Sequence, residues 1–277
     1  MKPANFTYHR ATSVEDAVAA LADTSQMSRV LAGGQSLVPM LNLRLAPVDT
    51  LIDLSRVASL KTVDEQSSAI RYGALTTHAA FEDGRVPDGS NGLMPYVGTQ
   101  IAYRAVRTRG TIGGAVALAD PAADWLTTII ALEADVIAIG ANGRRTIAAG
   151  EFAIGPYMTA LQDGELIEAI AVPRRPASER WGHEKMARKT GEYAESMAIA
   201  LIDRNRKTAR VVLGAADGAP IVLAETARAV AGGQTDDSLA SVIRTELVAS
   251  GRDFAPAKLL MHSTVILRAV KKAAAKQ

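Results

Sequence analysis

Apolar residues in the first part of the chain fall into short runs separated by polar turns. Residues 29–32 and 51–54 are short, mostly apolar runs, which is typical of buried strands. Residues 13–21 repeat apolar side chains at helical spacing. Thr12 or Ser13 can cap this helix, and an acidic residue three positions on can close a capping box. We therefore expect a small β–α–β lobe at this end.

The pattern changes beyond residue 55. Strands are predicted over residues 69–74 and 136–139, and a helix is expected to start within residues 76–81. Asn142-Gly143 is a strong hairpin signal. Residues 165–172 alternate between apolar and polar positions and stop at a proline, which indicates a further strand. These elements predict an α+β lobe.

A proline-flanked pair of arginines at residues 173–176 is a plausible boundary. Beyond it, residues 197–202 and 209–214 suit a small sheet. Helical spacing recurs in the segments that follow, which are residues 223–231, 239–249 and 256–272. The chain is thus expected to fold as α+β, in three units over residues 1–56, 57–174 and 175–277.

The amino-acid composition excludes several classes of function but does not by itself indicate one. Of the 277 residues 48% are hydrophobic but only 4% aromatic, so aliphatic side chains must fill most of the core. The net charge is +2, and no basic stripe with interleaved aromatic residues is present. Nucleic acid is therefore not an expected partner. The N-terminus lacks a secretory signal, and no apolar run is long enough for a transmembrane segment, so a cytoplasmic location is expected.

Cysteine is absent from the sequence. Disulfides, thiolate zinc sites and cysteine-ligated iron–sulfur clusters are therefore excluded within this chain. The histidines His9, His78, His183 and His262 show no metal-ligand spacing and form no recognisable triad, so structural roles are expected for them.

Two glycine pairs, Gly33-Gly34 and Gly113-Gly114, carry the strongest functional signal. Glycine has no Cβ, so an anion can approach its backbone N–H groups closely. Ser36 and Thr111 add a hydroxyl donor beside each pair. One such pair is more often a tight turn. Two of them, each expected to present free N–H groups, predict a dinucleotide held by its diphosphate between two lobes.

The residues around these pairs resemble a known family. Residues 32–36, 39–45 and 51–54 resemble its first flavin motif, and residues 109–114 with 119–124 resemble its second. The similarity extends through residues 157–159 and 184–191 to the C-terminal helix. The family is the FAD-binding medium subunit of the molybdenum hydroxylases, which includes carbon monoxide dehydrogenase and xanthine dehydrogenase. The resemblance implies a two-lobed PCMH-type FAD-binding fold followed by a C-terminal domain with a small antiparallel sheet and helices.

The resemblance also implies a set of FAD contacts and no catalytic or metal-binding residue. Ile167 matches a position that the family uses through its backbone, and Tyr193 matches an aromatic position close to the isoalloxazine. Where the family usually has Asn, Asp or Ser after the second glycine pair, this chain has Ala115, so one side-chain hydrogen bond is lost. The implied contacts are Leu31, Ala32, Gly33, Gly34, Gln35, Ser36, Leu37, Thr111, Ile112, Gly113, Gly114, Ala115, Asp124, Ile167, Lys185 and Tyr193.

Simpler structural roles compete with some of these assignments. Asp120 followed by Pro121 suits a helix start, so Asp120 and Asp124 could be capping residues. Lys185 lies in a charged segment that suits a solvated strand or loop. In the flavin interpretation, the Lys185 cation offsets the negative charge of the diphosphate or of the reduced flavin. Tyr193 could instead be a half-buried packing residue.

The expected function is that of an FAD-carrying electron-transfer subunit. The family implies a heterotrimer, assembled as a dimer of heterotrimers, with a large subunit that carries the molybdopterin cofactor and a small subunit that carries 2Fe-2S clusters. This chain would accept electrons from those clusters and pass them to an external acceptor. The alternatives are a self-contained FAD-dependent oxidase or reductase with its own substrate pocket, and a binding subunit that has lost its flavin. The substrate, whether carbon monoxide, an aldehyde, a purine or another N-heterocycle, is not encoded in a recognisable way, and neither is the terminal acceptor.

Overall fold

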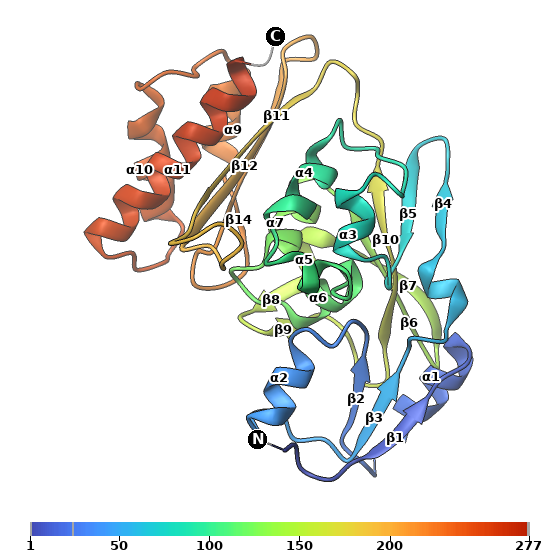
Figure 1. The fold of residues 1–277 in the computed structure, drawn as a ribbon. Coiled ribbons are helices and arrows are strands. Elements are labelled where there is room, and N and C mark those ends of the chain that lie inside the picture. Colours follow the sequence, from blue (N-terminus) through green and yellow to red (C-terminus); the bar gives the residue numbers. More distant parts are fainter. Residues whose placement is uncertain (1, 24, 276–277) are drawn as a thin grey trace.

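The computed structural model describes residues 2–23 and 25–275 (Figure 1). The first lobe is a parallel three-stranded sheet in the order β1-β3-β2, formed by β1 (Thr7–Arg10), β2 (Ser28–Leu31) and β3 (Thr50–Asp53). Helix α1 (Val14–Leu21) joins the first two strands, and α2 (Leu37–Asn42) follows β2. Ser13 caps α1 by accepting a hydrogen bond from the N–H of Asp16. The predicted β–α–β lobe and its cap are confirmed.

The second lobe is built on a five-stranded antiparallel sheet in the order β4-β5-β10-β6-β7. Its strands are β4 (Val63–Glu65), β5 (Ala69–Gly73), β6 (Asp135–Gly140), β7 (Gly143–Ala148) and β10 (Leu166–Pro173), and the one-turn helix η1 (Ala58–Lys61) precedes them. The strand β10 is central and almost wholly buried. Its alternating sequence would suit a strand with one exposed face, but other parts of the protein cover both faces. The expected β6–β7 hairpin is present, with Ala141 and Asn142 in the turn.

Between β5 and β6, the chain forms a series of helices. They are α3 (His78–Glu82), α4 (Leu93–Gln100), α5 (Arg104–Arg107), α6 (Ile112–Leu118) and α7 (Asp124–Ala131), and α8 (Ala149–Phe152) with the small hairpin β8 (Ala153–Gly155) and β9 (Met158–Thr159) follows β7. Trp125, Phe81 and Tyr72 form the aromatic centre of this lobe, with ring centroids 4.8 and 5.0 Å apart. Aliphatic residues surround them, as the low aromatic content requires.

The C-terminal unit is an antiparallel sheet of β11 (Arg180–Met186), β12 (Ser196–Asp203), β13 (Thr208–Gly214) and β14 (Ile221–Val222). Figure 1 shows α9 (Ala224–Ala231), α10 (Leu239–Ala249) and α11 (Pro256–Ala275) on one face of this sheet and α7 beyond the other. The predicted strands and helices of this part are confirmed. Among the residues described, no helix combines the length and apolarity needed to cross a bilayer.

Two glycines set how closely the helices approach this sheet. A Cβ atom on Gly182 would lie 2.0 Å from the carbonyl oxygen of Ala269 in α11. A Cβ atom on Gly214 would lie 2.0 Å from Oγ1 of Thr127 in α7. Both distances are far below contact distance, so these positions accept only glycine. The C-terminal sheet is therefore packed tightly against the second lobe through α7.

Candidate functional site

The two glycine loops, which are far apart in sequence, meet in the folded chain. A Cβ atom on Gly33 would lie 2.1 Å from the carbonyl oxygen of Arg109 and 2.9 Å from Cα of Gly110. On the other side, a Cβ atom on Gly114 would lie 3.3 Å from Cβ of Ala32. The loops therefore touch backbone to backbone where the first lobe meets the second.

The first loop leaves its backbone donors free. It connects β2 to α2, and Gly34 has φ +75°, a conformation that glycine adopts without strain. Within residues 2–23 and 25–275, no acceptor in the protein is recorded for the N–H groups of residues 33–37. The side chain of Gln35 instead donates to the carbonyl of Gly33, at 3.2 Å. A run of free N–H groups of this kind forms an anion-binding concavity.

The second loop differs, and the expectation of free N–H groups is wrong there. Ile112 donates to the carbonyl of Thr76 and Gly113 to that of Ala74, both at 2.9 Å. Gly114 donates to Oγ1 of Thr111 at 3.1 Å, because Thr111 is the N-cap of α6, and Ala115 donates to the carbonyl of Thr111 at 3.0 Å. What this loop can offer a ligand is the N–H of Thr111, which has no recorded acceptor in the described chain, and the hydroxyl proton of the same residue. The half-buried methyl of Ala115 packs on the core of the lobe.

The buried side chain of His78 packs against the second loop at Gly110. The backbone N–H of His78 donates to the carbonyl of Gly110 at 3.0 Å, and a Cβ atom on Gly110 would lie 2.6 Å from Nε2 of the ring. Nδ1 accepts a hydrogen bond from Nε1 of Trp125 at 2.9 Å, so the ring is the neutral Nε2–H tautomer. Burial, together with the nearby Arg107 cation, lowers the pKa of His78 to about 4.

Asp124 and Lys185 form a buried ion pair at the end of β11. Nζ of Lys185 lies 2.9 and 3.0 Å from the two carboxylate oxygens of Asp124, and both side chains are less than a tenth exposed. Lys185 is therefore not on a solvated strand. The pair is neutral as a whole, so it presents a dipole and not the free cation that the sequence suggested. Desolvation raises the pKa of the Asp124 carboxyl, while Lys185 opposes that rise.

The alternative in which Asp120 or Asp124 caps helix α7 is wrong. Helix α7 starts at Asp124 with Ala123 as its N-cap, so neither aspartate caps it. Asp120 instead closes a short turn by accepting from the N–H of Ala122 at 2.9 Å. The helix starts later than the Asp-Pro signal predicts, because the turn at residues 120–123 comes first.

Tyr193 and Tyr157 are exposed tyrosines that flank Asp120. Tyr193 is 59% exposed, while its hydroxyl end lies beside Ser36, so the residue links the β11–β12 connection to the first loop. Partial burial raises the pKa of its phenol, and Asp120 adds to the rise. Tyr157, which sequence reasoning gave no role, donates to Asp120 at 3.3 Å and has φ +57°. No sequence signal distinguishes that conformation from an ordinary turn residue.

The remaining predicted residues flank the junction of the lobes. Leu31 and Leu37 pack on the small cluster under α2. Ile167 is buried in β10 at an irregularity in its pairing with β6, and its neighbour Leu166 packs with Ile52 and Leu54 of the first lobe. The start of β10 therefore lies against the first lobe, which is consistent with a backbone role for Ile167.

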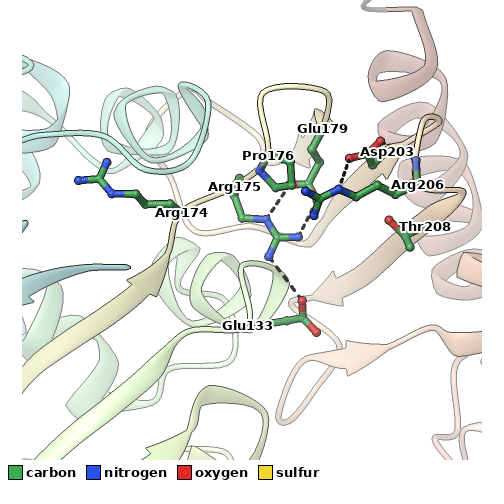
Figure 2. A pocket seen from close by; sticks show the side chains of 8 residues that line it. All are labelled: Glu133, Arg174, Arg175, Pro176, Glu179, Asp203, Arg206 and Thr208. Atoms are coloured by element: carbon green, nitrogen blue, oxygen red, sulfur yellow. Dashed lines mark hydrogen bonds and ion pairs between the residues drawn. The ribbon is translucent and has the colours of Figure 1, made fainter. Parts of the chain in front are cut away.

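A separate recess of about 380 Å³ contains none of these residues (Figure 2). Figure 2 shows Arg175 held between two carboxylates; its guanidinium lies 2.6 Å from Glu179 and 3.4 Å from Glu133. Arg206 faces Asp203 at 3.7 Å. The charges of this recess are matched within the protein, which is unlike an anion site. Among the described residues, no group of acidic, histidine or cysteine side chains could hold a metal ion.

Comparison with known proteins gives a consistent answer. Residues 4–175 match the family described as the FAD binding domain in molybdopterin dehydrogenase. The chain is 36% identical over 208 residues to the carbon monoxide dehydrogenase medium chain of Hydrogenophaga pseudoflava, which covers 75% of this chain and 72% of that one. It is 34% identical over 221 residues to the nicotine 6-hydroxylase medium subunit of Paenarthrobacter nicotinovorans, with 79% and 77% covered.

The fold agrees over the full length. A solved structure of carbon monoxide dehydrogenase from Hydrogenophaga pseudoflava has a chain that superposes with a TM-score of 0.92, at 32% identity and with 99% of both chains covered. The expected α+β fold and the expected family are confirmed. The chain therefore belongs to the family of FAD-binding medium subunits of the molybdopterin dehydrogenases.

Proposed function

We propose that this chain holds one noncovalent FAD across the junction of its first two lobes, with the diphosphate on the first glycine loop. The observation that carries the proposal is the free N–H run of residues 33–37, where the loop meets the second glycine loop. The residues present fit a diphosphate, because the N–H groups of residues 33–37 have no recorded acceptor in the described chain and the loop turns at the positive-φ Gly34. The hydroxyls of Ser36 and Thr111 add donors at the same place.

The other proposed contacts surround this cradle. Lys185 and Asp124 would supply a fixed dipole in a desolvated position, where an electrostatic interaction is stronger than in water. Tyr193 would cover the flavin from the β11–β12 connection. The proposed contact set is Leu31, Ala32, Gly33, Gly34, Gln35, Ser36, Leu37, Thr111, Ile112, Gly113, Gly114, Ala115, Asp124, Ile167, Lys185 and Tyr193.

In the complex, we propose that the chain relays electrons. Bound FAD can take up electrons one at a time and release them in pairs, which links a cluster to a two-electron acceptor. The chain has no cysteine, so 2Fe-2S clusters must lie on another polypeptide. The relatives named above are medium chains or subunits. The proposed assembly is a dimer of heterotrimers in which a small subunit carries the clusters and a large subunit carries the molybdopterin cofactor and the substrate pocket.

This chain's own residues would bind and orient the cofactor and would not act on the organic substrate. His78, His183 and His262 are buried, and burial lowers their pKa values to about 4, 3 and 4, so they are neutral at pH 7. The relatives act on molecules as different as carbon monoxide and nicotine, as their names state. These different names support the proposal that the substrate pocket of the complex lies on another chain.

The test has two parts. Acid or heat precipitation of the chain or its complex should release FAD into the supernatant, and a colourless protein that takes up no FAD on reconstitution would support a subunit that has lost its flavin. Anaerobic reduction should then be followed optically on the chain alone and on the complex with and without flavin. In the flavin-free complex, substrate should still reduce the metal centres while transfer to the acceptor stops. Bleaching of the flavin in the isolated chain by an aldehyde or alcohol, at a useful rate, would replace the relay with a self-contained oxidase.

A further inference from the structure

Residues 100–110, here called the bridging segment, contact both halves of the proposed flavin site. At one end the segment meets the first glycine loop, where the carbonyl of Arg109 and Cα of Gly110 press on Gly33. At the other end it meets the C-terminal unit, where Gln100 accepts a hydrogen bond from Nζ of Lys185 at 3.3 Å. Helix α5 connects the two ends.

The turn that begins this segment has an unusual backbone. Helix α4 ends at Gln100, and Ala102 has φ +42°, a conformation that an L-residue adopts at a cost. Gly191 lies directly on this turn, because a Cβ atom there would be 2.6 Å from the carbonyl oxygen of Ala102. Gly191 itself has φ +88° and precedes Tyr193 by two residues. The conformation of the turn therefore sets where the β11–β12 connection rests.

Arg107 holds this turn in place. One terminal nitrogen donates to the carbonyls of Ile101 and Ala102, at 3.0 and 2.8 Å. Nε and the other terminal nitrogen form a forked pair with the carboxylate of Glu82, both at 2.8 Å. The side chain is only 12% exposed. The guanidinium of Arg107 thus hydrogen-bonds two carbonyl groups that lie beyond the end of helix α4 and have no helical donor. The carboxylate of Glu82 in turn holds the guanidinium in place.

We propose that Arg107 is a positioning residue for the flavin site, acting through the bridging segment on Lys185 and Tyr193 without touching either of them. This inference rests on the proposed function, since it explains how the first glycine loop and the C-terminal unit are held in fixed positions relative to each other. It predicts that loss of the Arg107 side chain both loosens the β11–β12 connection, residues 187–195, and weakens FAD binding.

Arg104 offers a matched control. It pairs with the same Glu82 and with Asp83, all at about the same short distances as Arg107, but it is half exposed and has no recorded bond to the 101–102 carbonyls in the described chain. Arg107→Gln and Arg104→Gln remove the same charge from the same cluster. They differ in whether the turn loses its support.

The first measurement needs no cofactor. Arg188 and Lys189 are exposed in the β11–β12 connection, and trypsin can cleave after each of them. In the full chain, Arg107→Gln should speed cleavage at these two sites by about fivefold or more, and Arg104→Gln by less than about twofold, because cleavage of a folded protein follows local opening. Mass spectrometry identifies the cut sites. Equal cleavage rates in the two variants would overturn the proposal.

The second measurement uses bound flavin. In FAD titrations of the chain and of its complex, Arg107→Gln should weaken binding by about tenfold and alter the visible circular dichroism of the bound flavin, whereas Arg104→Gln should do neither. Gly191→Ala should reproduce both effects from the other side of the contact, which keeps the test decisive if Arg107→Gln folds poorly. An unchanged flavin spectrum in both Arg107→Gln and Gly191→Ala would also overturn it. If the unaltered protein bound no FAD, the proposed function would fail, and the trypsin comparison would still test the coupling.

Discussion

The two glycine pairs look alike in sequence but have different physical roles in the fold. In the first loop, the N–H groups of residues 33–37 have no recorded acceptor within the described chain, whereas in the second loop those of residues 112–115 are all bonded. The difference arises because the second pair opens a capped helix that is docked on the Thr76 and Ala74 carbonyls. A Gly-Gly pair therefore indicates close approach, but only the surroundings decide whether a ligand or another part of the chain approaches.

Within each pair, the two glycines also have different surroundings. A Cβ atom on the first one would collide with another segment, 2.1 Å from the Arg109 carbonyl for Gly33 and 2.5 Å from Cβ of Ala74 for Gly113. A Cβ atom on the second one would meet only side-chain atoms, at 3.2 Å or more for Gly34 and 3.0 Å or more for Gly114. The first glycine of each pair thus serves packing, and the second borders the space proposed for the diphosphate.

The largest effect is expected for Gly34→Val. Gly34 has φ +75°, which a β-branched residue strongly disfavours, and its loop carries the free N–H groups. We expect FAD affinity to fall at least about 100-fold, which is about 2.8 kcal/mol, with little change in far-ultraviolet circular dichroism. Flavin titration measures the first quantity.

Gly114→Val is the counterpart in the second loop. Its N–H is already bonded and its φ is not positive, so we expect a smaller loss, caused by crowding against Thr111 and Ala32. Gly150→Val is a control outside the loops, since a Cβ there meets nothing within 4 Å. An equal or larger loss for Gly114→Val than for Gly34→Val would show that the contrast between the loops has no bearing on FAD.

Acid should disturb the second loop through His78. A histidine whose pKa is lower in the folded protein than in the unfolded chain keeps its contribution above the unfolded value and loses it as the pH falls toward the folded value. With values of about 6.5 and about 4, the window is pH 6.5 to 4. At pH 5 the free energy of unfolding should have fallen by about 2 kcal/mol on account of this residue.

Denaturant unfolding across this pH range measures that loss. His78→Gln should flatten the slope, because an amide can accept from Trp125 without titrating. His183→Leu should flatten the slope as well, because His183 is also buried, its ring nitrogens have no hydrogen-bond partner in the described chain, and burial lowers its pKa to about 3. It lies outside the loops, so the two variants separate the acid sensitivity of the second loop from that of the C-terminal sheet. An unaltered slope in His78→Gln would contradict this assignment.

A smaller effect is expected for Thr111→Val, which removes the N-cap of α6. Loss of the bond from Gly114 N–H should cost about 1 kcal/mol of stability. It should also weaken FAD binding, because the hydroxyl proton that remains available to a ligand disappears. Thr111→Ser should restore both quantities. Restored stability without restored FAD affinity would mean that the hydroxyl serves the helix alone.

Much of the fold could be predicted because its elements follow local patterns. The strands at residues 29–32 and 51–54 and the C-terminal helices have clear periodicity, and the structure confirms them with shifts of a residue or a few at their ends. The α1 cap was equally readable, because Ser13 and Asp16 interact within one turn. Family motifs supplied the rest of the architecture.

What could not be predicted depends on partners distant in sequence. Lys185 is buried because Asp124, 61 residues away, neutralises it. The N–H groups of the second loop are bonded because Ala74 and Thr76 lie beneath it. The support that Arg107 gives to the 101–102 turn and the left-handed conformation of Tyr157 are likewise invisible in a local pattern. The predicted site residues themselves remain to be tested by the variants above.

The central position of β10 has a consequence for how the protein folds. This strand joins the β4–β5 and β6–β7 pairs into one sheet, and its Glu168 pairs with Arg71 across 97 residues of chain. Closing so long a loop costs chain entropy before any contact compensates for it. During synthesis, the first lobe has all its strands once residue 53 has left the ribosome, but the second sheet cannot be completed until residue 173 has left it. The first glycine loop thus belongs to a lobe whose strands are all available early, whereas the second glycine loop belongs to a lobe whose sheet waits for β10, a strand that contributes only Ile167 to the proposed flavin contacts.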